Sequence, residues 1–73
     1  MPNEPILLCK ATCKTKYGQT VQYSVYNTKD GVEIQGPDLR TFRCNPWVKN
    51  CEDAKIEIAN RFGVRVISVA DRA

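Results

Sequence analysis

The sequence predicts a small α+β domain, in which an antiparallel sheet of three to five strands carries one helix on one face. Three observations predict it: apolar and polar residues alternate in several segments, residues 50–63 show helical spacing between two caps, and turn residues separate the segments. The predicted order is β-β-β-(β)-α-β. At 73 residues the chain makes a single domain, 1–73, and residues 1–5, with two prolines, are expected to form a frayed terminus.

The first two predicted strands form a hairpin. Residues 7–17 alternate, and their inward set is Leu7, Cys9, Ala11, Cys13, Thr15 and Tyr17. Their outward set is Lys10, Thr12, Lys14 and Lys16. A Gly-Gln turn follows, and residues 20–27 repeat the pattern with Val21, Tyr23 and Val25 inward. A polar outward side is typical of a sheet that has one face in water.

A short third strand and a closing strand complete the sheet. Val32 and Ile34 point inward on the third strand, which a Gly-Pro-Asp sequence then breaks. Residues 39–44 form either a fourth strand, with Phe42 and Cys44 inward, or an extended arm that leads to the helix. After the helix, the closing strand is predicted by Val64, Val66, Ile67 and Val69.

The stretch 50–63 is the predicted helix. Asn50 can cap its start, because a side-chain oxygen accepts a free backbone N–H there, and Gly63 can end it in a left-handed conformation. The buried stripe is formed by Cys51, Ala54, Ile58 and Phe62. Lys55 lies at the edge of that stripe. The acids expected on the polar side are Glu52, Asp53 and Glu57. One helix covers one face of a sheet, so the other face is predicted to be open.

The four cysteines are predicted to be thiols in the core, since all fall on inward positions and a reducing cytosol disfavours disulfides. Cys9 and Cys13 are four residues apart on a strand, a separation of ~13 Å. That separation is too large for a disulfide or for two ligands of one zinc ion. Two alternatives stay open: Cys44 and Cys51 can approach each other where the chain enters the helix, and a four-cysteine zinc site forms if residues 9–13 are a loop.

The sequence lacks the usual equipment of an enzyme. It contains no histidine and no Gly-rich phosphate loop, and no acid, base and nucleophile form a recognisable set. Cys51 at a helix N-terminus could have a lowered pKa, but its place on the apolar stripe favours burial over reactivity. We therefore expect no catalytic residues, no metal and no cofactor.

Candidate binding residues fall on two surfaces. On the open sheet face and its turn they are Lys10, Lys14, Lys16, Tyr26 and Arg43. The alternative is that this face is polar only because water covers it. On the helix side they are Ile56, which points away from the buried stripe of the helix, and Trp47, which lies in the polar loop just before the cap. These two either pack with Val48 as a satellite cluster or form an exposed anchor for a partner or a second copy.

These observations predict a small binding protein that acts as a regulator, adaptor or inhibitor of a larger macromolecule through a protein–protein surface. The alternative is a nucleic-acid-binding module that uses the basic sheet face. Net charge is +3, which permits an anionic partner without demanding one. A homodimer would help so small a core. No apolar run approaches ~20 residues and no signal-peptide pattern is present, so we expect a cytoplasmic protein without membrane contact.

Overall fold

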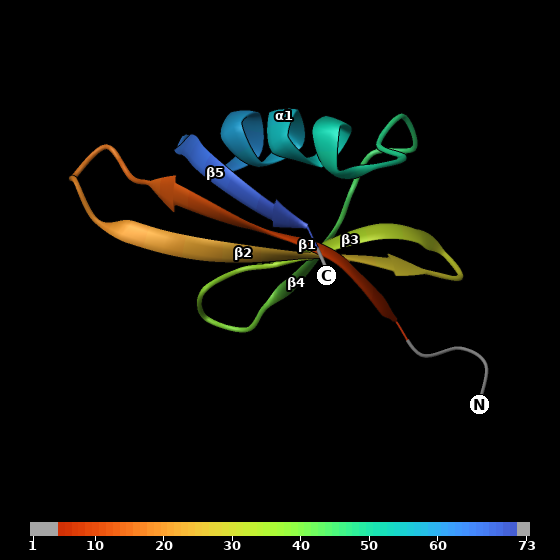
Figure 1. Cartoon of the computed structure of the whole chain (residues 1–73). Coiled ribbons are helices and arrows are strands. Elements are labelled where there is room, and N and C mark those ends of the chain that lie inside the picture. Colours follow the sequence, from red (N-terminus) through yellow and green to blue (C-terminus); the bar gives the residue numbers. More distant parts are fainter. Residues whose placement is uncertain (1–4, 72–73) are drawn as a thin grey trace.

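The computed structural model describes residues 5–71 and contains one five-stranded antiparallel sheet with one helix packed on it (Figure 1). The elements in chain order are β1 (Ile6–Lys14), β2 (Thr20–Thr28), β3 (Gly31–Gln35), β4 (Thr41–Arg43), α1 (Cys51–Phe62) and β5 (Arg65–Asp71). The predicted fold class and element order are confirmed. The segment 39–44, predicted as a fourth strand or an extended arm, contains the strand β4. The frayed terminus predicted for residues 1–5 lies, except for Pro5, outside the described residues.

The strand order across the sheet is β4-β3-β2-β1-β5. The chain therefore runs through β1 to β4 toward one edge, and the segment that contains α1 then returns it to the opposite edge, where β5 pairs with β1. Figure 1 shows α1 on one side of the sheet, above β1 and β5. Among residues 5–71 no second helix covers the other side, which is the predicted open face. The helix has 12 residues, and none of the described helices has the length and apolar character needed to cross a membrane.

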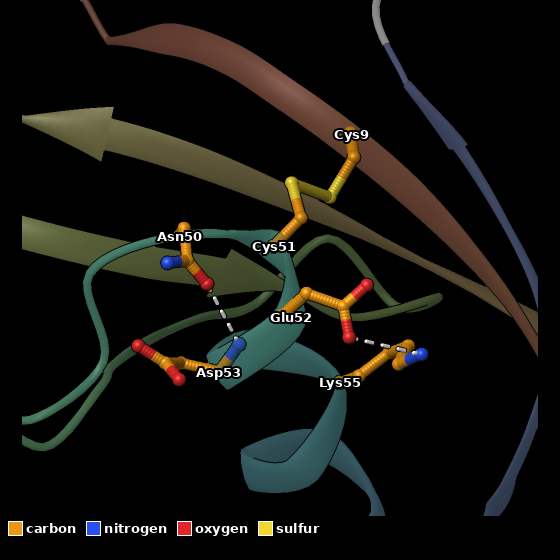
Figure 2. Close-up of a disulfide and its surroundings, with 6 residues drawn as sticks. All are labelled: Cys9, Asn50, Cys51, Glu52, Asp53 and Lys55. Carbon is orange, nitrogen blue, oxygen red and sulfur yellow. Dashed lines mark hydrogen bonds and ion pairs between the residues drawn. A yellow bond between two sulfur atoms is a disulfide. The ribbon is translucent and has the colours of Figure 1, made fainter.

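The helix begins and ends at the predicted caps. The side chain of Asn50 accepts a hydrogen bond of 2.9 Å from the backbone N–H of Asp53 (Figure 2). The Asp53 carboxylate in turn accepts a hydrogen bond of 3.1 Å from the backbone N–H of Lys49. Gly63 ends the helix at φ 65°, ψ 33°, and its N–H donates to the carbonyl of Ala59. Glycine adopts this left-handed conformation with little strain, because it has no Cβ atom to clash with the backbone.

The core lies between α1 and the sheet face beneath it. Its fully or nearly fully buried members are Cys9, Ala11, Cys13, Tyr23, Val25, Val32, Ile34, Cys44, Val48, Ala54, Ile58 and Val64. At the C-terminal end of the helix, the ring of Phe62 stacks on Tyr23 with centroids 4.8 Å apart and meets Phe42 edge-on at 5.0 Å. These aromatic contacts join α1 to β2 and β4, in addition to its packing on β1 and β5.

The predicted alternation of the first strand is right in its middle and wrong at both ends. Cys9, Ala11 and Cys13 are buried as predicted. The register with β2 shifts between Leu7 and Cys9, so a bulge turns Leu8, instead of Leu7, toward the core. The strand ends at Lys14, and Tyr17, predicted inward, is 79% exposed in the turn.

The closing strand also contains a bulge. Val66 and Val69 pack against the core, whereas Ile67, predicted as part of the same apolar run, is 52% exposed. The register with β1 shifts between Thr12 and Cys13, which makes Ile67 the extra residue on β5. The apolar run at residues 64–69 lacks strict alternation because β5 contains this bulge, and not because both faces of the strand are buried.

A disulfide joins Cys9 of β1 to Cys51, the first residue of α1 (Figure 2). Their Cα atoms are 6.5 Å apart, within the range that disulfides span. The prediction of thiols is therefore wrong for these two residues, and the alternative Cys44–Cys51 pairing is also wrong. The reason is tertiary: the helix starts above the middle of β1, so the partner of Cys51 lies 42 positions away in the sequence.

Cys13 and Cys44 are buried thiols, as predicted. The zinc alternative fails because two of its four sulfurs are joined to each other and cannot act as thiolate ligands. Within the part of the chain that the structure describes, no three His, Cys, Asp or Glu residues lie close enough to hold a metal ion.

Glu57 is the second correction. The sequence predicts Glu57 on the polar, exposed side of the helix, but the residue is buried and only 4% of its surface is exposed. Its carboxylate accepts hydrogen bonds of 3.3 Å from the Asn45 amide at both oxygens, and it pairs with Arg61 at 3.1 Å. Arg61 also donates to the backbone carbonyl of Arg43 at 3.2 Å. Glu57 therefore anchors the helix to β4 and to the loop that follows it, instead of serving solubility.

We predict that loss of the Cys9–Cys51 disulfide lowers the free energy of unfolding by about 4 kcal/mol, the loop-closure value for a 42-residue separation. The measurement is urea unfolding of Cys9→Ala/Cys51→Ala beside the oxidised wild type. Reductant should lower the wild-type midpoint and leave the double variant unchanged. Equal midpoints for oxidised and reduced wild type would contradict the assigned stabilisation.

We predict that Glu57→Ala destabilises the fold by about 2 kcal/mol, because the Asn45 amide and the half-buried Arg61 lose their acceptor. The matched control is Glu52→Ala, which removes an exposed partner of Lys55 at 3.4 Å and should cost less than ~0.5 kcal/mol. Both are read from chemical denaturation at neutral pH. Similar losses for the two variants would show that the Glu57 network contributes no more than a surface ion pair.

Candidate functional site

The open sheet face can be reconstructed row by row from the strand register. Side chains of directly paired residues lie on the same face, with Cβ atoms about 4.5–5.5 Å apart. The row nearest the β1–β2 turn contains Thr20, Lys14 and Arg65, and the next contains Gln22, Thr12 and Ser68. The third row contains Thr41, Gln35, Ser24, Lys10 and Ala70, and the fourth contains Arg43, Glu33, Tyr26 and Leu7.

Positive charge on this face gathers along β1 and β5. Lys10, Lys14 and Arg65 are all exposed, and Lys16 follows in the turn directly beyond Lys14. We call these four residues the basic stripe. Lys10 and Lys14 are four residues apart on one strand, a span of ~13 Å. Glu33, the acid on the face, lies two strands away on β3. The stripe is therefore a local excess of cations and not an average property of the face.

The pair formed by Lys14 and Arg65 stands out in this stripe. The two residues are directly opposite each other in the β1–β5 ladder, where like charges are destabilising. Among the side chains that the structure describes, neither residue has an acidic partner within 4.0 Å. Lys16 also lacks one there, and its ammonium lies 5.4 Å from the Tyr17 ring. Without a counter-charge this pair costs stability, which makes it a candidate contact for an anionic group.

The other end of the open face is electrically balanced. Arg43 lies beside Glu33 in its row and 4.0 Å from Asp30. The hydroxyl of Tyr26 donates to the side chain of Gln35 at 3.4 Å, and the ring is half-buried among its neighbours. Tyr26 and Arg43, both predicted binding residues, therefore lie apart from the stripe and already have partners.

The two candidates on the helix side lie away from the open face. Trp47 is 46% exposed and Ile56 is 52% exposed, so neither is fully covered. Val48, predicted to join them in a satellite cluster, is 3% exposed and belongs to the main core. The structure thus divides the seven predicted residues among the stripe (Lys10, Lys14, Lys16), the balanced end of the face (Tyr26, Arg43) and the helix side (Trp47, Ile56).

Arg65 is the residue of the stripe that sequence reasoning missed. It lies between the buried Val64 and the core-facing Val66, so the alternation of the closing strand already placed its side chain outward. Which strand β5 would pair with was not visible in the sequence. Only the order β2-β1-β5 puts Arg65 next to Lys14.

The two free thiols are poor nucleophiles. Burial raises the pKa of the Cys44 thiol to about 11, with a smaller contribution from the nearby Glu57 carboxylate. Burial also raises the pKa of Cys13. Both groups are therefore protonated at neutral pH, whereas the reactive form of cysteine is the thiolate. The other two sulfurs are held in the disulfide, which leaves Cys51 without the reactivity that its helix position could have given it.

No family model, no curated protein and no solved structure matches this chain. The function must therefore be argued from the geometry of the stripe and its surroundings.

We predict that Arg65→Glu stabilises the protein by about 0.5–1 kcal/mol, because it replaces a like-charge pair with an opposite-charge pair. The gain should shrink as salt rises from ~20 mM to ~1 M, over which screening becomes short-ranged. The measurement is urea unfolding at both salt concentrations. In the double variant Lys14→Glu/Arg65→Glu the gain should vanish again. A gain that persists in the double variant would show that Lys14 and Arg65 do not interact.

Proposed function

We propose that this protein is a non-enzymatic binding protein that acts as a regulator, adaptor or inhibitor by docking the acidic surface of a protein partner on its open sheet face. The observation that carries the proposal is the basic stripe: three exposed cations on one uncovered face and a fourth in the adjoining turn, with two of the four directly opposed without a counter-charge. An acidic partner would supply the missing charges and relieve the repulsion. Such complementarity gives an interface its specificity and speeds association.

The reactive groups support binding over catalysis. The thiols of Cys13 and Cys44 are buried and protonated, and the chain has no histidine that could act as a base near pH 7. Each acid of the helix already has a partner: Glu52 pairs with Lys55, Asp53 accepts the backbone N–H of Lys49, and Glu57 pairs with Arg61. These features favour a protein that presents a surface.

A protein partner is favoured over a single-stranded nucleic acid by the aromatic residues of the face. Binding to single strands uses exposed aromatic rings on which bases stack. Among the described residues of the open face the aromatic one is Tyr26, which is half-buried and hydrogen-bonded to Gln35 next to Glu33. The ring of Tyr17 is exposed in the turn beside Lys16, so the stripe offers one exposed ring and not a row of them. In contrast, Ile67 is 52% exposed at the bulge of β5, next to the stripe. Arginine is enriched in protein interfaces, and their fully buried centres are more apolar than the rest of the surface.

Duplex nucleic acid is the second candidate, and the line of cations supports it. Lys10, Lys14 and Lys16 follow one another along β1 and its turn, so they could contact successive phosphates without any base stacking. Such binding would weaken steeply with salt, at a slope of about −0.9 per phosphate neutralised in a plot of log affinity against log salt. Binding of an acidic protein patch should depend on salt less steeply.

The cytoplasmic location and the homodimer stay predictions. Disulfides are rare in reducing compartments, so the Cys9–Cys51 bond weighs against a cytosolic location for the oxidised form. Alkylation of the native protein followed by intact-mass measurement would show which form the cell contains. For a homodimer, β5 offers an edge of seven residues whose described neighbour is β1 alone.

The test of the proposed function is affinity capture from the source cells with wild type, Lys10→Glu/Lys14→Glu and Trp47→Ala as baits, with and without nuclease. We predict that the double charge reversal reduces the captured partner at least about tenfold, since two attractive contacts become repulsive. Trp47→Ala should capture a normal amount. Lys29→Glu, a reversal in the β2–β3 turn, is the matched control.

Two results would contradict the proposal. If Trp47→Ala abolishes capture while the charge reversals do not, the partner docks on the helix side. If nuclease removes the partner and purified duplex binds with the steep salt slope described above, the stripe serves nucleic acid.

A further inference from the structure

The end of the basic stripe borders a hollow between the β1–β2 turn and the loop that joins α1 to β5. We call this hollow the turn pocket. Its volume is about 500 Å³, and its lining consists of Lys14, Thr15, Lys16, Gly18, Gly63, Val64 and Arg65. Three of these seven residues are cations and none is an acid. Two loops that are far apart in the sequence therefore meet around a positively charged hollow.

The hydroxyl of Thr15 adds a hydrogen-bond donor to this lining. Its oxygen accepts hydrogen bonds of 3.2 Å from the backbone N–H groups of Tyr17 and Gln19. A hydroxyl has two lone pairs and one hydrogen, so with both lone pairs engaged the hydrogen remains to donate. The hydroxyl therefore favours a ligand that offers an acceptor atom over a cation or a donor group.

The two glycines keep the backbone accessible. A Cβ built on Gly18 or on Gly63 would meet no atom within 4 Å, so both face open space. Both have positive φ angles, +83° and +65°, which glycine adopts without strain. Without side chains at these two places, a ligand can approach the walls of the turn pocket closely.

The end of the helix partly opposes an anion here. The carbonyl end of a helix carries roughly half a negative charge, and Gly63 lies at that end. Three full positive charges outweigh this half charge by a wide margin. The net potential in the turn pocket is therefore positive.

We propose that the turn pocket is a binding site for a phosphomonoester dianion, held by Lys14, Lys16 and Arg65 with a hydrogen bond from the Thr15 hydroxyl. A dianion with three terminal acceptor oxygens matches three cations and one donor better than a singly charged phosphodiester does. It also neutralises the Lys14–Arg65 repulsion, because both cations line the pocket. The ligand is either a free phosphate compound or a phosphorylated side chain, since both present the same group.

This site is distinguishable from the docking face of the proposed function. Lys10 belongs to the open face but not to the turn pocket, and Lys16 lines the pocket from the turn. The proposal for the pocket does not rest on the partner being a protein. A variant at Lys10 therefore tests the face, and a variant at Lys16 tests the pocket.

The experiment is an amide NMR titration at constant ionic strength and pH 7.5, with methyl phosphate as the probe and dimethyl phosphate as the singly charged control. We expect saturable shifts that centre on residues 14–18 and 63–65. Methyl phosphate should bind roughly fivefold more tightly than dimethyl phosphate, the value of one added charge interaction near a solvated surface. Lys16→Gln should weaken methyl phosphate by roughly fivefold, whereas Lys10→Gln and Lys29→Gln should change it less than twofold.

Two further arms compare inorganic phosphate with a phosphoserine peptide. Tighter binding of the peptide assigns the site to a phosphorylated side chain, and the reverse order assigns it to a free phosphate compound. Shifts that are linear, unsaturated and equally large around Lys29 would overturn the proposal, because they would report only ionic screening. Equal affinity for methyl and dimethyl phosphate would overturn it too. These readings come from wild type, so they stand even if a variant fails to fold.

Discussion

One helix must cover a five-stranded sheet, and this constraint determines the rest of the structure. The first residue of the helix is bonded to β1, its last contacts β2 and β4, and the helix packs on one face of the sheet and leaves the other face in water. Its position is held at the start by the Cys9–Cys51 disulfide, along its length by the Glu57–Arg61–Asn45 network and at its end by the stacking of Phe62 on Tyr23. A core this small needs such additional ties.

The same arrangement creates the charged surface. Because the helix returns the chain to the β1 edge, β5 pairs with β1, and Arg65 comes to lie beside Lys14. The turn after β1 and the loop after α1 then meet at one end of the sheet and enclose the turn pocket. The proposed docking face and the proposed phosphate site are thus neighbouring parts of one surface, and both depend on where the closing strand lies.

The sequence was sufficient for the fold but not for the contacts between distant segments. The caps Asn50 and Gly63 and the alternation around Cys9 to Cys13 are local signals, and local geometry fixes them. The Cys9–Cys51 bond, the burial of Glu57 and the position of Arg65 depend on which distant segments touch, and no periodicity encodes this. The bulges at Leu8 and Ile67 add further errors, since each interrupts the alternation between the residues on its two sides. For the candidate site, the outward position of the lysines could therefore be predicted from the sequence, but the position of Arg65 beside Lys14 could not.

The most direct test of the account is lysine acetylation of the free protein and of its captured complex, measured residue by residue by mass spectrometry. If the partner docks on the open sheet face, complex formation should slow the acetylation of Lys10 and Lys14 on that face. The acetylation of Lys49 and Lys55 on the helix side should not change. Protection of Lys49 and Lys55 with full reactivity of Lys10 and Lys14 would contradict the account, because the partner would then cover the helix and leave the stripe in water.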